Sequence, residues 1–132
     1  MKNYTPQLPR SSTKTPPRLS LEARIQADVV RYLQTEKVFC HSVPNEAGGR
    51  SAVMQMQLIS MGMRPGCADL VVWWPTPIGI RIGYLELKNE KGKQSEAQVK
   101  FETRCREAHV SYDVVRSVEE VQELLRQYRG RV

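Results

Sequence analysis

The stretch Tyr84-Leu85-Glu86-Leu87-Lys88 alternates between apolar and charged side chains, as a β-strand does when one of its faces is buried. In a strand, Leu85 and Leu87 point to one face and pack against apolar neighbours. Glu86 and Lys88 share the opposite face, so a carboxylate and an ammonium project together. An ordinary solvated strand has the same pattern, and this run alone therefore leaves both interpretations open.

A second carboxylate precedes this strand. Asp69 follows the turn Pro65-Gly66 and begins an apolar run that ends at Trp74. We expect residues 69–74 and 80–88 to form an antiparallel hairpin around a turn at residues 75–79, which brings Asp69 beside Glu86. Two close carboxylates repel each other unless a cation bridges them, and Mg²⁺ prefers such oxygen ligands together with a substrate phosphate. With Lys88 to orient water or stabilise charge on the phosphate, the pattern indicates phosphodiester hydrolysis.

The flanking sequence predicts an α/β fold, with a mixed β-sheet flanked by helices. Leu21, Ile25, Val29 and Leu33 recur every fourth residue and predict a helix from Ser20 to about Lys37. Two capping boxes, Ser95 with Gln98 and Ser117 with Glu120, predict the starts of two later helices. A short helix is expected over residues 51–61, and further strands over residues 38–43 and 111–116.

Charge and composition favour a polyanionic partner. The net charge is +6 and the pI about 9.5, and Lys and Arg neutralise phosphates. Residues 1–18 hold four cations, no acid and half of the prolines, so we interpret them as a flexible basic arm and residues 19–132 as one domain.

The sequence also predicts where the protein is found. No apolar run is long enough to cross a membrane, and no secretory signal is visible. The three cysteines fit reduced thiols, so we expect a cytoplasmic protein.

The motif around the two carboxylates resembles a known family. Asp69 followed by Glu86-Leu87-Lys88 resembles the PD-(D/E)xK nuclease motif. The longer string resembles the VRR-NUC branch, the virus-type replication-repair nucleases, over roughly residues 20–125. That string runs Gly62-x-x-x-Pro65-Gly66-x-x-Asp69-Leu70, then Tyr84 to Lys88, then Gly92-Lys93-x-Ser95-x-x-Gln98.

The resemblance implies a restriction-endonuclease-like core and DNA cleavage that depends on Mg²⁺ or Mn²⁺. It implies that Asp69, Glu86 and the backbone carbonyl of Leu87 bind the metal, and that Lys88 is the catalytic lysine. It also implies that Gln98 supports the site and that Glu22 binds metal through water. Two purely structural interpretations stay open: Gln98 as half of a capping box, and Glu22 as a favourable charge at a helix N-terminus.

The expected partner is branched or duplex DNA. The resemblance suggests a phage- or prophage-encoded homodimer acting on four-way junctions. A basic rim is expected from Arg50, Arg64, Lys91, Lys93, Lys100 and Arg104, although each residue alone could be a solvated surface charge. Met54, Met56, Met61 and Met63 could form a dimer surface, a DNA surface or plain core. The alternatives are a non-catalytic DNA-binding or packaging protein with this fold, a general DNA exonuclease or nickase, and a nuclease that acts on RNA.

Overall fold

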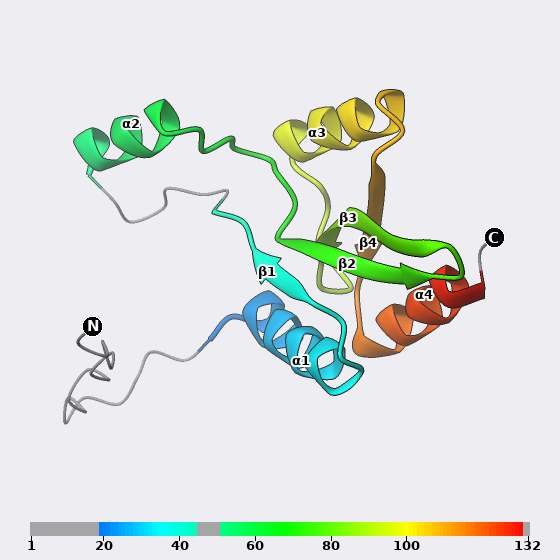
Figure 1. Cartoon of the computed structure of the whole chain (residues 1–132). Coiled ribbons are helices and arrows are strands. Elements are labelled where there is room, and N and C mark those ends of the chain that lie inside the picture. The colour runs from blue at the N-terminus through cyan, green and yellow to red at the C-terminus, as the bar shows by residue number, and fades with distance from the viewer. Residues whose placement is uncertain (1–18, 45–50, 131–132) are drawn as a thin grey trace, which may run out of the picture.

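The computed structural model describes residues 19–44 and 51–130. The predicted arm and Arg50 lie outside the described residues. The elements are α1 (Leu21–Thr35), β1 (Cys40–Ser42), α2 (Ala52–Ser60), β2 (Leu70–Thr76), β3 (Gly79–Leu87), α3 (Glu96–Glu107), β4 (Ser111–Val115) and α4 (Val118–Gly130) (Figure 1). Their order is the one the sequence predicts. None of the described helices is long and apolar enough to cross a membrane.

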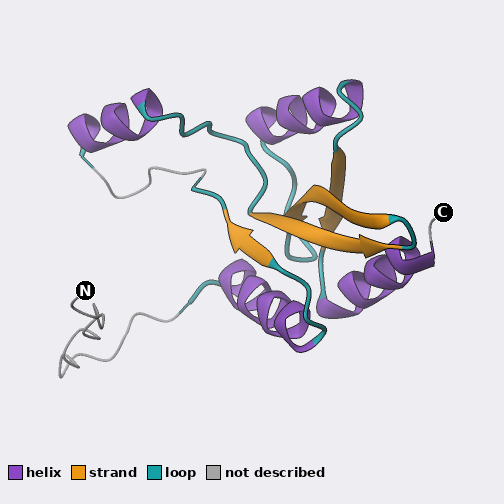
Figure 2. Cartoon of the chain, viewed as in Figure 1, coloured by secondary structure: helices purple, strands orange, loops and turns teal. Residues whose placement is uncertain are grey.

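The strands form one mixed sheet in the order β1-β2-β3-β4 (Figure 2). β2 pairs antiparallel with both β1 and β3, and β3 pairs parallel with β4. The connection from β3 to β4 contains α3, as a parallel pair requires a crossover. The predicted hairpin and the predicted mixed sheet are both confirmed.

The main core lies between one sheet face and helices α1 and α4. The largest fully buried side chain is Trp74, which stacks on Tyr128 of α4 with ring centroids 4.6 Å apart. Leu85 and Leu87 contribute to the same core from β3. From α1, Val29 and Leu33 are buried, whereas Leu21, at the start of the predicted stripe, is exposed.

The other sheet face carries α3, as Figure 1 shows. A smaller apolar cluster forms there around Ala68, Cys105 and Tyr112. Phe101 of α3 makes edge-on contacts with Tyr84 and Tyr112. This cluster leaves room on the same face for polar side chains at the end of β3.

The first helix and the first strand are shorter than the sequence predicts. The first helix ends at Thr35 because Lys37 adopts a left-handed backbone (φ 58°), after which the N–H of Val38 donates to the Leu33 carbonyl. The predicted strand over residues 38–43 is only Cys40–Ser42. Pro75, predicted in a turn, lies inside β2, where it faces Ile80 across the hairpin.

The second capping box is only half formed. The Ser117 hydroxyl accepts a hydrogen bond from the backbone N–H of Glu120, as predicted. The Glu120 carboxylate, however, accepts from the N–H of Arg116 and not from that of Ser117. The pattern therefore located the helix start correctly, but the return bond reaches one residue further back.

Helix α2 stands apart from the rest of the molecule (Figure 1). It contains no buried residue and packs against no other helix or strand among the described residues. Val53, Met56 and Met61 around it are all more than two-thirds exposed. Of the four predicted Met residues only Met63, in the segment after α2, is buried.

Candidate active site

The turn before β2 is held tightly against α3. Gly66 has φ +89°, and a Cβ built on it would lie 2.5 Å from the backbone C and O atoms of Ala97. Only glycine combines this backbone conformation with such a close approach. The chain leaves the turn through the buried Ala68 and reaches Asp69, the residue directly before β2.

Asp69 is bound to the end of β3. Its Oδ2 accepts a hydrogen bond from the backbone N–H of Leu87 at 2.8 Å. The hairpin therefore brings the Asp69 carboxylate to the stretch that carries Glu86 and Lys88, as the sequence predicts. The Leu87 backbone lies at the site through its N–H, and metal binding by its carbonyl stays a prediction.

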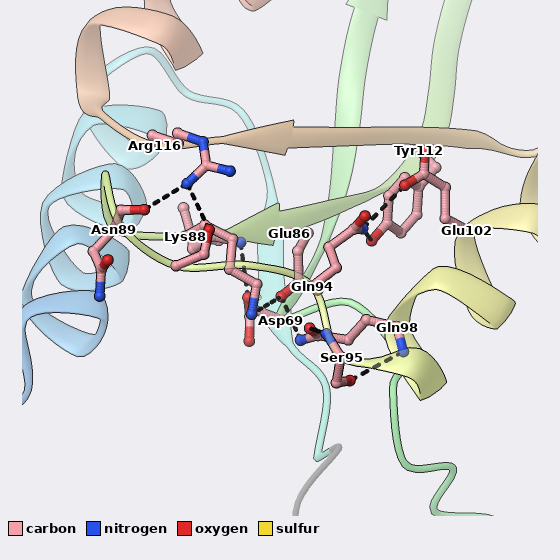
Figure 3. A network of polar contacts seen from close by, with 12 residues as sticks. Asp69, Glu86, Lys88, Asn89, Gln94, Ser95, Gln98, Glu102, Tyr112 and Arg116 are labelled. Carbon is pink, nitrogen blue, oxygen red and sulfur yellow. Dashed lines mark hydrogen bonds and ion pairs between the residues drawn. The ribbon is translucent and has the colours of Figure 1, made fainter.

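Glu86 is completely buried at the centre of this cluster (Figure 3). Its Oε1 accepts a hydrogen bond from the Gln98 amide at 2.8 Å and lies 3.6 Å from the Lys88 ammonium. Lys88 itself is only 7% exposed. The second oxygen, Oε2, is buried without a hydrogen-bond partner among the described residues.

Burial, more than any neighbour, raises the pKa of the Glu86 carboxyl from its ordinary 4.5 to about 8. The Asp69 carboxylate raises this pKa further, while the Lys88 ammonium opposes the shift. Ionisation of Glu86 is thus opposed both by its burial and by the negative charge of the nearby Asp69. A cation placed between the two carboxylates would offset this repulsion.

Gln98 forms the predicted capping box and also contacts Glu86. Its Oε1 accepts from the backbone N–H of Ser95 at 2.8 Å, and the Ser95 hydroxyl accepts from the Gln98 N–H. Because the amide oxygen of Gln98 is held by the Ser95 backbone, the Nε2 group of the same side chain points away from that backbone. There it donates to Glu86. The helix cap therefore orients a donor toward the buried carboxylate.

Arg116 was not predicted as a site residue. Its guanidinium donates to the backbone carbonyls of Asn89 and Gly92 (Figure 3). It thereby holds the loop that directly follows Lys88. The sequence places Arg116 at the end of a predicted strand but gives no signal for these partners.

Solved structures that are similar to this chain include two VRR-NUC domains. One is a "VRR_NUC domain", with a TM-score of 0.57, 23% identity, and coverage of 81% of this chain and 96% of that one. The other is a "VRR_NUC domain protein", with a TM-score of 0.57, 15% identity, and coverage of 84% and 89%. This chain has the fold of a VRR-NUC domain. No family model matches the chain, and no curated protein matches it.

Within this VRR-NUC fold, Glu22 lies at the edge of the cluster. It is partly buried in the first turn of α1, and its Oε1 lies close enough to Gly92 that a Cβ there would be 3.0 Å away. Glu22 thus contacts the loop after β3. It does not form a three-carboxylate group with Asp69 and Glu86, since the described residues contain no such metal-binding group. Binding through water stays a prediction.

Five of the six residues of the predicted basic rim are described in this VRR-NUC fold. Lys91 and Lys93 are exposed on the loop after β3. Arg64, Lys100 and Arg104 instead gather around one cavity between the Gly66 turn and α3. Arg50 lies outside the described residues, and a basic rim that includes all six residues stays a prediction.

The donor set fits Mg²⁺ or Mn²⁺. It offers oxygen atoms from Asp69 and Glu86, including the unpartnered buried Oε2 of Glu86. These ions are commonly held by one or two carboxylates plus substrate phosphate. The described residues show no convergence of three or more His, Cys, Asp or Glu side chains, which a closed zinc site would need.

Proposed function

We propose that this protein is a Mg²⁺- or Mn²⁺-dependent DNA nuclease whose active site contains Asp69, Glu86 and Lys88. The observation that carries the proposal is the buried Glu86 carboxylate, which has one oxygen without a hydrogen-bond partner beside a second carboxylate and a buried ammonium. Burying a carboxylate costs free energy unless it is fully paired and hydrogen-bonded, and carboxyls with strongly raised pKa values concentrate at functional sites. The likeness to VRR-NUC structures supports the same conclusion.

Each side chain then has a role that follows from its contacts. Asp69 and Glu86 bind the metal, which supplies Lewis acidity toward a phosphoryl oxygen. Lys88, beside Glu86, orients the attacking water or donates to the phosphate as negative charge develops on it. Gln98 is a positioning residue, because it holds Oε1 of Glu86 while its own orientation is fixed by Ser95.

The test is cleavage of supercoiled plasmid with Mg²⁺ or Mn²⁺. Wild type should nick or linearise the plasmid, and Lys88→Ala and Asp69→Ala should each lower the rate by about 100-fold or more. Arg126→Ala, which removes an exposed guanidinium paired with Glu123 on α4, is the matched control and should cut normally. If wild type cuts plasmid, linear or branched DNA no faster than Lys88→Ala does, the nuclease proposal is wrong. The alternative of a non-catalytic DNA-binding protein would then be favoured.

We further propose branched DNA as the substrate and a homodimer as the active form. Two apolar surfaces support the dimer: α2, and the exposed part of the sheet around Phe39, Trp73 and Ile82. The α2 segment, residues 51–63, contains no charged side chain. Such a surface suits a second copy of a basic chain better than it suits a DNA backbone, which requires cations.

The dimer is tested by light scattering during gel filtration. Wild type should elute with twice the mass of one chain, and Met56→Glu should shift it to the monomer, because the new carboxylate would be desolvated in the interface. A wild type that stays monomeric at every concentration would contradict the dimer but not the nuclease. Digestion of labelled single-stranded, duplex, flap and four-way DNA, with RNA counterparts, tests the substrate and separates endonuclease from exonuclease.

A further inference from the structure

A cavity of about 310 Å³ lies between the turn that precedes β2 and one side of α3. Its residues on α3 are spaced three and four apart, so they share one side of the helix. The cavity is lined from the turn by Arg64, Pro65 and Cys67, and from α3 by Ala97, Lys100, Phe101 and Arg104.

This cavity adjoins the candidate active site. Ala97 forms part of its wall and is the residue against which Gly66 packs. The next residue along the helix is Gln98, which binds Glu86. Asp69 follows Gly66 by three positions. A nucleic-acid strand bound at Glu86 therefore has this cavity within reach of its next nucleotides.

The rim of the cavity is strongly positive. Burial raises the pKa of the Cys67 thiol, while Arg64 and Arg104 lower it, so both guanidinium groups act on the interior of the cavity. Lys100 is the third cation, and its exposed ion pair with Glu96 (3.3 Å) is weak enough to exchange for a phosphate. No acidic side chain lines the cavity among the described residues.

The inner surface of the cavity is apolar. Phe101 and Pro65 contribute to it beside the half-buried Cys67. A phosphate group alone needs cations but no apolar surface. A nucleotide needs both, because its base stacks on aromatic side chains while its phosphate binds cations. The volume is at the lower end of the range typical of small-molecule sites.

We propose that this cavity binds one unstacked nucleotide of the DNA next to the cleaved phosphate, with its base against Phe101 and its phosphate between Arg64 and Arg104. This inference rests on the proposed nuclease function and gives it a source of selectivity. A regular duplex keeps its bases stacked and presents only phosphates to the rim. DNA with an unpaired nucleotide at a branch, flap or bulge fills the cavity as well.

The experiment compares two fluorescent duplexes that differ by a single bulged nucleotide, with binding measured by anisotropy in EDTA so that no cleavage occurs. Wild type should bind the bulged DNA at least about fivefold more tightly, since stacking of one base on an aromatic side chain contributes about 1–3 kcal/mol. Phe101→Leu should lose this preference and keep its affinity for the plain duplex. Arg104→Ala should weaken binding of both DNAs and lower the salt slope by about 1. Arg126→Ala is the charge-matched control.

Because Phe101 also packs against Tyr84 and Tyr112, a second measurement avoids substitution altogether. Alkylation of Cys67 in the wild type, followed by mass spectrometry, should be slowed by the bulged DNA more than by an equally saturating plain duplex. Equal protection by both DNAs, or equal affinity for them, would overturn the inference. A bulge preference without plasmid cleavage would support the cavity and contradict the nuclease; cleavage without the preference would do the reverse.

Discussion

The two faces of β3 differ in character although they alternate along one strand. Toward α1 and α4, Leu85 and Leu87 are buried in an apolar core. Toward α3, Glu86 and Lys88 are buried almost as completely. Burial of the leucines stabilises the fold by removing apolar area from water. Burial of Glu86 costs stability, because it removes a carboxylate from water and leaves one oxygen without a hydrogen bond.

This difference indicates how stability and function are divided in the molecule. The face that packs on α1 and α4 holds the hairpin in register. The opposite face uses that register to hold charged groups close together at a cost in free energy. A substitution on the first face should therefore destabilise the protein, whereas removing the Glu86 charge from the second should stabilise the metal-free protein above pH 4.5 and abolish activity.

The largest expected effect on stability is that of Leu85→Ala. Removing a fully buried leucine leaves a cavity in the main core and should lower the free energy of unfolding by about 2–5 kcal/mol. In a monomeric sample the matched control is Ile82→Ala in the exposed part of the same strand, where the side chain is 55% exposed and the expected loss is about 1 kcal/mol or less. Urea denaturation measures both. Equal losses would contradict the assignment of stability to the buried apolar face.

Gly66→Ala should follow, with a loss of about 1–3 kcal/mol and a lower cleavage rate. The new Cβ meets the Ala97 backbone, so the turn must move away from α3 and carry Asp69 with it. Gly62→Ala separates the two causes of strain. Gly62 also has a positive φ, but a Cβ there meets nothing within 4 Å. Thermal unfolding should show the larger loss for Gly66, and cleavage should fall for Gly66→Ala alone.

Glu86→Gln tests the cost of the charged face through pH. The pKa of Glu86 is about 8 in the folded protein and 4.5 when exposed, so between these values the folded state binds more protons than the unfolded state. Stability of the metal-free protein should therefore fall as pH rises from about 4.5 to 8, relative to the variant. Glu86→Gln should be the more stable protein at pH 8, and this gain should vanish near pH 4.5.

Metal should reverse this trend in the wild type. Because Mg²⁺ or Mn²⁺ binds the ionised carboxylate, its stabilising effect should grow as pH approaches 8 and be absent in Glu86→Gln. Melting temperatures with and without excess metal measure this. If metal raised the melting temperature equally in the two proteins, the ion would not bind at Glu86.

The main parts of the fold and site were predictable because they depend on local pattern. The alternation around Glu86 and the Ser95 capping box each follow from spacing along one element. What the sequence could not predict depends on packing between elements. Arg116 reaches across to the carbonyls of Asn89 and Gly92, and nothing in its neighbours indicates those partners.

The grouping of three basic residues around one cavity was unpredictable for the same reason. Arg64 lies far from Lys100 and Arg104 in the sequence, and only the Gly66 contact with α3 brings them around one cavity. The isolation of α2 was equally hidden, since its apolar residues have the composition of a core helix. Burial depends on whether a neighbour packs against a helix, and composition alone does not report that.

The smallest expected effect is that of Ser95→Ala, which removes a helix cap beside the charged face. Loss of the hydroxyl that accepts from the Gln98 N–H should cost about 1 kcal/mol. The other half of the box persists, because the Ser95 backbone N–H still donates to Gln98 and keeps its amide directed at Glu86. Cleavage should therefore change much less than in Gln98→Leu, which loses the donor itself.

Ser51→Ala removes the matching cap of α2, where the hydroxyl accepts from Met54 at the same distance of 3.2 Å. Because α2 packs against no other described element, its fraying should leave the global unfolding transition of a monomeric sample almost unchanged. If both serine variants lost equal stability, α2 would be part of the cooperative fold; if Ser95→Ala lost cleavage as Gln98→Leu does, the cap itself would be what positions Glu86.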